Sequence, residues 1–157
     1  MSESMQVAVL SGSPSDAEFV QACCEQLTAM GISHEARVLS AHRQGEALQE
    51  FMQESEQRGC QLYIAMAGMA AHLPGVVASM TPRPVLGVPL KGGVLDGLDA
   101  LLSVVQMPRG VPVACLAVGK AGAKNAAILA AQILAVGDDA LAGKVRELKA
   151  SMAEAAR

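Results

Sequence analysis

The sequence predicts an α/β fold, in which one parallel sheet carries helices on both faces as a three-layer sandwich. Five short strand-like runs alternate with helix-forming segments, and the links between them are short. This order is typical of parallel sheets, because each crossover between parallel strands is long enough to hold a helix. The size agrees: 157 residues with 52% hydrophobic composition suit a single domain over 1–157 with one buried core.

The first half of the chain is expected to contain three strands, each followed by a helix. The strands cover residues 6–10, 34–39 and 60–66, and the helices cover 14–30, 44–58 and 72–80. Ser13 is a good N-cap residue with Pro14 at the first helical position, and Asp16 falls three residues after the cap. Gly31 suits the left-handed residue that ends a helix.

Two further strands and three helices are expected in the second half. The strands cover 85–88 and 112–118, and the helices cover 97–105, 125–136 and 139–155. The last helix is the more charged, and we expect it to pack on the core or on a neighbouring subunit. Small aliphatic residues greatly outnumber aromatic ones, which suits close packing between helices, sheet and subunits. We therefore expect a homo-oligomer.

Composition argues against several classes of partner and site. The net charge is −3, aromatic residues make up 2% of the chain and no basic cluster is present, so nucleic acid is not an expected partner. No apolar run reaches the ~20 residues that span a membrane. Residues 1–4 are polar without a basic flank, so no signal peptide is expected. The four cysteines lack zinc-site or disulfide spacing and are interpreted as unreactive thiols in a reducing cytoplasm.

Four loops follow the first four strands at the carboxyl edge of the predicted sheet, where open α/β sheets bind ligands. They cover residues 11–16, 40–43, 67–72 and 89–96. The first loop, Gly12-Ser13-Pro14-Ser15-Asp16, places hydroxyls and backbone N–H groups at a helix N-terminus, which suits a phosphate. A helix cap without a ligand explains the same residues equally well. Neither this loop nor Gly119-Lys120-Ala121 matches a dinucleotide-binding or P-loop motif.

The second loop, Ser40-Ala41-His42-Arg43, is the strongest candidate for chemistry. Imidazole has a pKa of about 6.5, so a histidine here suits acid or base catalysis near neutral pH. Arg43 suits the binding of a phosphate or carboxylate through two hydrogen bonds. The alternative is structural, with His42 capping the following helix and Arg43 on its surface. The position directly after a strand favours the functional interpretation.

His72 belongs to a third loop that is rich in small residues, over 68–75. Small residues allow a ligand to approach the backbone closely. The alternative is a histidine buried between helix and sheet and bonded to a carbonyl. Neither His42 nor His72 has a carboxylate or cysteine at ligand spacing, so no metal is expected.

Together with later motifs, these loops resemble a known family. The motifs occur in order as Gly12-Ser13-Pro14-Ser15-Asp16, Ser40-Ala41-His42-Arg43, Ala70-Ala71-His72-Leu73-Pro74-Gly75, Gly87-Val88-Pro89, Gln106-Met107-Pro108-Arg109-Gly110-Val111-Pro112-Val113 and Ala121-Gly122-Ala123-Lys124-Asn125-Ala126-Ala127. This ordered set, over roughly residues 6–136, resembles the class I N5-carboxyaminoimidazole ribonucleotide mutases (PurE) of purine biosynthesis. The resemblance implies a flavodoxin-like fold, a homo-octamer, a ribonucleotide substrate and a reaction without cofactors.

The resemblance also implies roles for the loop residues. His42 would be the general acid and base. Ser13 and Asp16 would bind the ribose phosphate, and Arg43 would bind substrate charge. His72 would line the pocket that holds the carboxylate or transient CO2. The substrate site as a whole would comprise Gly12, Ser13, Ser15, Asp16, Ser40, Ala41, Arg43, Gly68, Ala70, Ala71, His72 and Leu73.

The implied reaction moves a carboxylate from the exocyclic N5 of the substrate to C4 of its imidazole ring. A proton delivered to the leaving nitrogen helps CO2 to depart, and attack by C4 leaves a proton on C4 that must be removed. One histidine suits both steps, in a closed pocket that keeps CO2 beside C4. The alternatives are a class II carboxylase that uses CO2 directly, a non-catalytic flavodoxin-like binding module and an inactive oligomeric scaffold.

Two stretches depart from the family pattern. Met69 stands where glycine is usual in the Gly-Gly-Ala-Ala-His stretch, so its side chain is expected to crowd the pocket or to alter the loop. Lys91-Gly92-Gly93-Val94 replaces a loop that more commonly carries serine and alanine. Both changes concern the geometry of the substrate site more than the fold.

Overall fold

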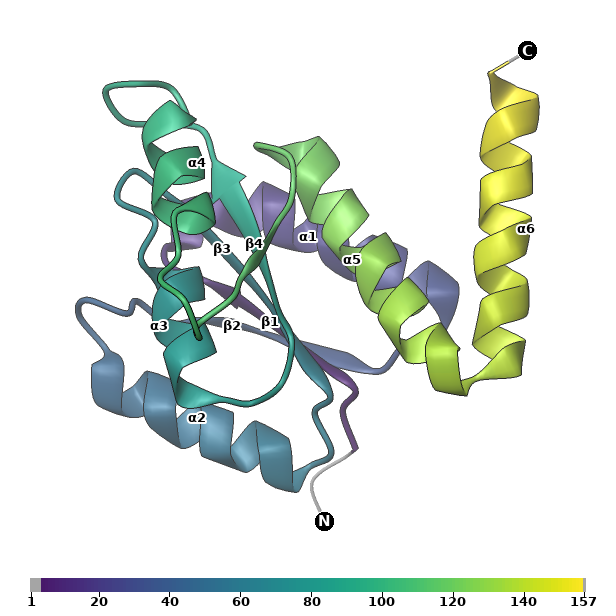
Figure 1. Cartoon of the computed structure of the whole chain (residues 1–157), viewed down its shortest axis with the longest axis horizontal. Helices are drawn as coiled ribbons and strands as arrows, with labels where there is room; N and C mark the ends of the chain where they lie inside the picture. The colour runs from purple at the N-terminus through teal and green to yellow at the C-terminus, as the bar shows by residue number, and fades with distance from the viewer. Residues whose placement is uncertain (1–3, 157) are drawn as a thin grey trace.

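The fold is a five-stranded parallel sheet covered by helices on both faces, seen in a computed structural model that describes residues 4–156 (Figure 1). The strand order is β2-β1-β3-β4-β5, and all neighbouring strands are parallel. The strands are β1 (Val7–Ser11), β2 (His34–Val38), β3 (Leu62–Gly68), β4 (Val85–Leu90) and β5 (Ala114–Cys115). Residues 1–3, which carry part of the signal-peptide prediction, and residue 157 lie outside the described residues.

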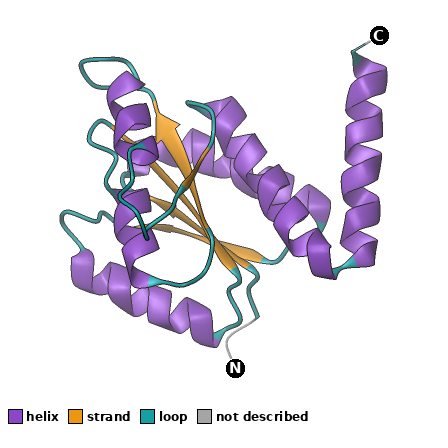
Figure 2. Ribbon diagram, viewed as in Figure 1, coloured by secondary structure: helices purple, strands orange, loops and turns teal. Residues whose placement is uncertain are grey.

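Six α-helices make up the two outer layers of the described chain. They are α1 (Ala17–Met30), α2 (Gly45–Gln57), α3 (Leu73–Met80), α4 (Leu98–Val105), α5 (Lys120–Leu134) and α6 (Asp139–Ala155), and short 3-10 helices cover Pro14–Asp16 and Ala135–Gly137. Helices α2, α3 and α4 lie on one side of the sheet, and α1 and α5 lie on the other, with α6 beyond α5 (Figures 1 and 2). The predicted three-layer α/β fold is therefore confirmed.

The sheet separates two hydrophobic cores, because successive strand side chains point to opposite faces. On β1, Val7 and Val9 pack toward α1 and α5, whereas Ala8 and Leu10 pack toward α2 and α3. All five residues of β1 are buried. A strand buried on both faces reads as a continuous apolar run, which is why the sequence pattern located it.

The local signals around the first helix are mostly confirmed. Ser13 is the N-cap of the 3-10 helix, and its Oγ accepts a hydrogen bond from the Ser15 N–H at 3.3 Å. Helix α1 starts only at Ala17, and Asp16 makes no side-chain capping bond to it. Gly31 ends α1 in the left-handed conformation, with φ of 74°. The turn of 3-10 helix moves the start of α1 three residues past the predicted position.

The predicted start of the fifth helix was wrong, since α5 begins at Lys120 rather than at residue 125. A Cβ atom at Gly122 would lie 1.6 Å from the carbonyl oxygen of Ala117. Glycine therefore allows the first turn of α5 to fold directly against the preceding chain. Further along α5, five buried alanines give close contact with the sheet and with α1: Ala123, Ala126, Ala127, Ala130 and Ala131.

The fifth strand was predicted too long, because β5 covers only Ala114–Cys115 of residues 112–118. Gly87 and Pro89 of β4 direct their carbonyls toward this edge, where they accept bonds from the N–H groups of Leu116 and Gly119 at 2.9 Å. Proline has no N–H to return such a bond. The regular ladder between β4 and β5 therefore ends at the pair Gly87 and Cys115, before the level of Pro89.

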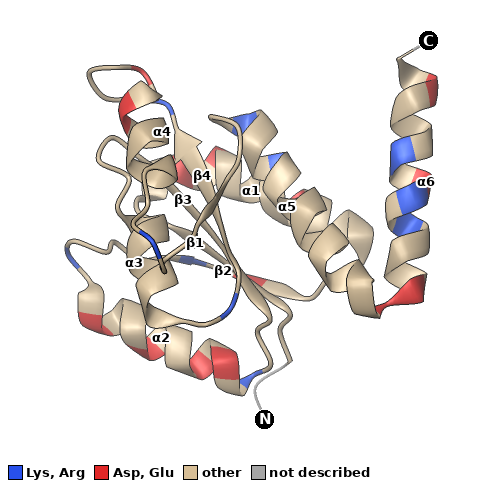
Figure 3. Ribbon diagram, in the orientation of Figure 1, with Lys and Arg blue, Asp and Glu red and all other residues tan. Residues whose placement is uncertain are grey.

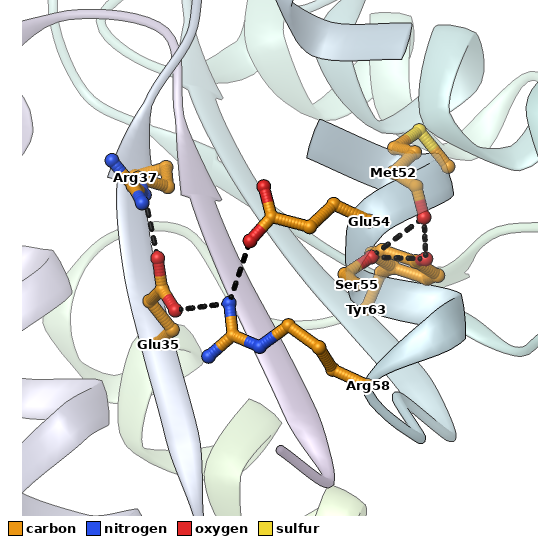
Figure 4. A network of polar contacts seen from close by, with 7 residues as sticks. All are labelled: Glu35, Arg37, Met52, Glu54, Ser55, Arg58 and Tyr63. Carbon is orange, nitrogen blue, oxygen red and sulfur yellow. Dashed lines mark hydrogen bonds and ion pairs between the residues drawn. The ribbon is translucent and has the colours of Figure 1, made fainter. Parts of the chain in front are cut away.

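A polar network joins β2 and α2 at the surface of the fold (Figure 4). Glu35 forms ion pairs with Arg37 at 2.6 Å and with Arg58 at 2.7 Å, and Arg58 also contacts Glu54 at 3.2 Å. Nearby, the buried hydroxyls of Ser55 and Tyr63 lie 2.8 Å apart, so Tyr63 is buried with a hydrogen-bond partner. These contacts fix the position of α2, which follows the loop that carries His42.

Candidate active site

A pocket of about 520 Å³ opens at the carboxyl edge of the sheet. The strand ends are aligned there, because Ser11 pairs with Val38 and Met66, and Gly68 pairs with Leu90. The loops after β1, β2, β3 and β4 form its walls, as predicted. The pocket has the size of a small-ligand site and lies where open α/β sheets bind ligands.

The structure brings together all predicted site residues except Ala71. Ala71 is fully buried and packs in the core on the α2 and α3 side. The residues of the pocket wall are Gly12, Ser13, Ser15, Asp16, Ser40, Ala41, His42, Arg43, Ala67, Gly68, Met69, Ala70, His72, Leu73, Lys91, Gly92 and Gly93. The predicted list of substrate-binding residues did not contain Ala67, Met69 or residues 91–93, although the loops over 67–72 and 89–96 were expected at the ligand-binding edge. Ala67 lies at the end of β3, whereas Met69 and residues 91–93 directly follow β3 and β4.

The first loop folds into a compact set of hydroxyl and backbone groups. The Oγ atoms of Ser13 and Ser15 lie 2.8 Å apart, and the Asp16 N–H donates to the Ser13 carbonyl at 3.1 Å. Burial raises the pKa of the Asp16 carboxyl, and hydrogen bonds from the Ser13 backbone and the Ser15 side chain oppose that shift. The loop thus holds one partly desolvated carboxylate beside two hydroxyls, which suits hydrogen bonds to sugar hydroxyls.

The second loop is closed by a double contact between Ser40 and Gln44. The Ser40 N–H donates to the Gln44 Oε1 at 3.0 Å, and the Gln44 N–H donates to the Ser40 carbonyl at 2.8 Å. Ser40 is buried, whereas His42 and Arg43 between the two anchors are exposed. His42 is not the cap of α2, because Gln44 takes that position. The loop therefore presents His42 and Arg43 to the pocket from a fixed base.

The central feature of the pocket is a direct contact between two histidines. Nε2 of His42 lies 2.6 Å from Nδ1 of His72, and the rings meet edge to face at 79° with centroids 4.8 Å apart. One of these two nitrogens donates the hydrogen bond and the other accepts it, so only one of the two carries a proton. Nδ1 of His42 and Nε2 of His72 have no hydrogen-bond partner among residues 4–156, so one nitrogen of each ring is available to a ligand.

The third loop carries Met69 in a conformation that favours glycine. Its φ is 56°, and the residue is 63% exposed. The Ala71 N–H donates to the Met69 carbonyl at 2.9 Å, and the His72 N–H donates to the Ala70 carbonyl at 2.7 Å. These tight turns orient His72 at the start of α3. The methionine therefore leaves the loop turn intact while adding apolar surface to the pocket wall.

Two cations and one carboxylate line the pocket: Arg43, Lys91 and Asp16. Within residues 4–156, neither Arg43 nor Lys91 forms a salt bridge. Elsewhere, Lys and Arg residues lie on several elements, and α6 carries three of them: Lys144, Arg146 and Lys149 (Figure 3). The described residues hold no group of three or more His, Cys, Asp or Glu side chains placed for a metal ion. The site thus combines unpaired positive charge with a histidine pair.

An open parallel sheet with a pocket at its strand ends is typical of the α/β proteins that bind small ligands at that edge. No helix in the described range is both long and apolar enough to cross a membrane. The profile of the AIR carboxylase family matches residues 6–155. The chain belongs to this family.

Individual relatives agree with the family assignment. A protein of Brucella melitensis named N5-carboxyaminoimidazole ribonucleotide mutase is 49% identical over 96% of this chain and 93% of its own. A protein of the same name from Escherichia coli K12 is 51% identical over 87% of this chain and 80% of its own. The crystal structure of Treponema denticola PurE superimposes with a TM-score of 0.87 at 30% identity, over 95% of this chain and 92% of that chain.

Proposed function

We propose that this protein is a mutase that moves the carboxylate of N5-carboxyaminoimidazole ribonucleotide from N5 to C4. Several relatives carry the name of this activity, at 45–51% identity. The observation that carries the proposal in this chain is the contact of His42 with His72, thirty positions apart, inside the pocket. A histidine pair beside unpaired cations suits proton transfer on an anionic nucleotide.

In the proposed mechanism, the first two loops bind the nucleotide and His42 moves the protons. Ser13 and Asp16 bind the ribose phosphate, and Arg43 neutralises substrate charge. His42 donates a proton to N5 as the bond between N5 and the carboxylate carbon breaks and CO2 forms. C4 then attacks CO2, a new carbon–carbon bond forms, and His42 takes the proton from C4. The histidine thus returns to its starting protonation state in each cycle.

His72 has a second part in this proposal, because its contact occupies Nε2 of His42. That hydrogen bond orients the His42 ring and leaves Nδ1 for the substrate. His72 and the small residues around it line the space where CO2 is held between its release and recapture. Holding CO2 beside C4 accounts for much of the acceleration, since a free molecule would diffuse away.

A turnover assay tests the function. One sample receives N5-carboxyaminoimidazole ribonucleotide without ATP or bicarbonate, and a parallel sample receives aminoimidazole ribonucleotide with high bicarbonate. We expect rapid formation of the C4-carboxylated product in the first sample alone. Product in the second sample alone would assign the class II carboxylase reaction. Product in neither would overturn both enzymatic functions in favour of a binding module or scaffold.

We further propose that the protein forms a homo-octamer in the cytoplasm. Leu98, Leu102 and Val105 project from α4 at helical spacing and stay exposed in the single chain. Leu141 and Val145 of α6 are buried, whereas Met152 further along is 51% exposed, which suits contact between the distal half of α6 and a neighbouring subunit. All four cysteines are unpaired, as suits a reducing compartment. Light scattering should show eight times the single-chain mass, and a monomer would contradict the octamer.

A further inference from the structure

The proposed mechanism assigns no role to Lys91, a charged residue of the pocket wall. Lys91 follows β4 directly and lines the pocket together with Gly92 and Gly93. It forms no salt bridge within the described residues, and the pocket wall contains a single carboxylate, that of Asp16. Its stem passes Gly97, where a Cβ atom would lie 3.6 Å from Cγ of Lys91. The ammonium group therefore has no ion-pair partner among the described residues, and the first part of the side chain lies beside Gly97.

The strand order decides which part of the nucleotide Lys91 meets. Along the carboxyl edge, the loops follow the order β2, β1, β3, β4, so Arg43 and Lys91 stand at opposite ends of the pocket. Three strand spacings separate their loops, roughly 14 Å at about 4.8 Å each. Ser13 and Asp16 occupy the loop beside that of Arg43, whereas His72 occupies the loop beside that of Lys91. The two cations therefore serve different parts of a bound molecule.

The substrate of the proposed reaction has two anionic groups at its two ends. The phosphate and the carboxylate are separated by the ribose and by the imidazole ring, so one side chain cannot neutralise both. At the end of the pocket formed by the loops after β3 and β4, the lining residues other than Lys91 offer only the His72 imidazole and backbone groups as polar partners. An unpaired ammonium there is expected to bind a carboxylate, because hydrogen bonds between charged groups are among the stronger ones.

We propose that Lys91 binds the carboxylate of the substrate and of the C4-carboxylated product, an inference that rests on the proposed mutase function. CO2 itself is neutral, so Lys91 acts on the two carboxylated nucleotides rather than on the intermediate between them. It therefore favours carboxylated ligands over aminoimidazole ribonucleotide, which has the same phosphate and no carboxylate. Lys91 is a specificity-determining residue in this role, and His42 keeps the proton transfers.

Calorimetric titration with two nucleotides tests this role. The His42→Asn background prevents turnover during the measurement, and Lys91→Met removes the charge while keeping the length of the side chain. We expect Lys91→Met to weaken binding of the C4-carboxylated product roughly tenfold and to change binding of aminoimidazole ribonucleotide less than about twofold. Lys91→Arg should retain most of the affinity. Lys124→Met, at an exposed position of α5 outside the pocket wall, is the matched control and should change neither.

The outcomes separate this inference from the function on which it rests. If Lys91→Met leaves both affinities unchanged, or weakens both equally, the carboxylate role is overturned while the mutase function stands. If the His42→Asn protein binds neither nucleotide and the unmodified protein shows no turnover, the mutase function itself fails, and the role of Lys91 fails with it. Selective loss of the carboxylated nucleotide supports both.

Discussion

Met69 and Gly93 fit together across the mouth of the pocket. A Cβ atom at Gly93 would lie 3.1 Å from Cγ of Met69, so the methionine side chain rests directly on the glycine backbone. Both residues have positive φ, 56° at Met69 and 93° at Gly93. The two departures from the family pattern are therefore in contact. The glycine of one loop makes room for the methionine of the other.

Gly93→Ala should destabilise the protein more than Gly92→Ala. Both glycines have positive φ, so an alanine is strained at either position, at a cost of about 1 kcal/mol. At Gly93, the new Cβ would also meet Met69 at 3.1 Å and Asp99 Oδ2 at 2.7 Å, whereas nothing lies within 4 Å at Gly92. Urea unfolding of the two variants measures the difference. Equal losses would show that the Met69 and Asp99 side chains move away from the added Cβ without a cost in stability.

Met69→Gly is expected to give equal or higher turnover. Glycine adopts the left-handed conformation without strain, and removal of the side chain opens the pocket wall. The loss of one exposed apolar contact should offset part of the gain in stability. Steady-state kinetics on N5-carboxyaminoimidazole ribonucleotide compares kcat of the variant with that of the unmodified protein. A large fall in kcat would show that the methionine is adapted to this site.

His42→Asn should yield a folded oligomer with turnover reduced by at least about 100-fold, the usual contribution of a general acid–base group. The asparagine keeps a polar side chain in the loop and removes the group that moves protons. His34→Asn is the control, because His34 begins β2 and its Nδ1 lies 2.8 Å from the Ile32 carbonyl oxygen, away from the pocket. Near-normal turnover in His42→Asn would refute the catalytic role.

Asp16→Asn is expected to stabilise the fold at pH 7 and to weaken nucleotide binding. Burial raises the pKa of Asp16 above its ordinary value of 3.8, so the protonated form favours the folded state. That contribution is complete below pH 3.8 and is lost as the pH rises through the folded-state pKa. At pH 7 the ionised carboxylate therefore opposes folding, by less than about 1 kcal/mol because the group is only partly buried.

Urea unfolding at pH 3 and pH 7 tests this sign. The gain of Asp16→Asn over the unmodified protein should appear at pH 7 and vanish at pH 3. Glu50→Gln, an exposed acid on α2, controls for the loss of a negative charge. A gain at pH 3 alone would contradict the assignment of the effect to burial of the carboxyl.

Local pattern was enough to predict the layers, the parallel sheet and the edge that holds the site. The strand over 7–11 is buried on both faces and reads as a continuous apolar run. Ser13 caps the 3-10 helix and Gly31 ends α1, both through bonds to residues close in the sequence. Parallel strands place the loops that follow them at one edge of the sheet, and this rule predicted that the loops lining the pocket lie together. The shortened β5 and the early start of α5 escaped prediction, because they depend on Pro89 and Ala117, which lie outside each element.

The sequence by itself thus determined the fold class, the family and most residues of the pocket, since these follow from periodicity, capping and ordered motifs. Only the tertiary structure decided which side chains touch. His42 meets His72, Met69 rests on Gly93, and Ala71 turns into the core. Each of these depends on how separate loops are oriented by the sheet beneath them. That orientation is a property of packing between distant segments, which no local pattern records.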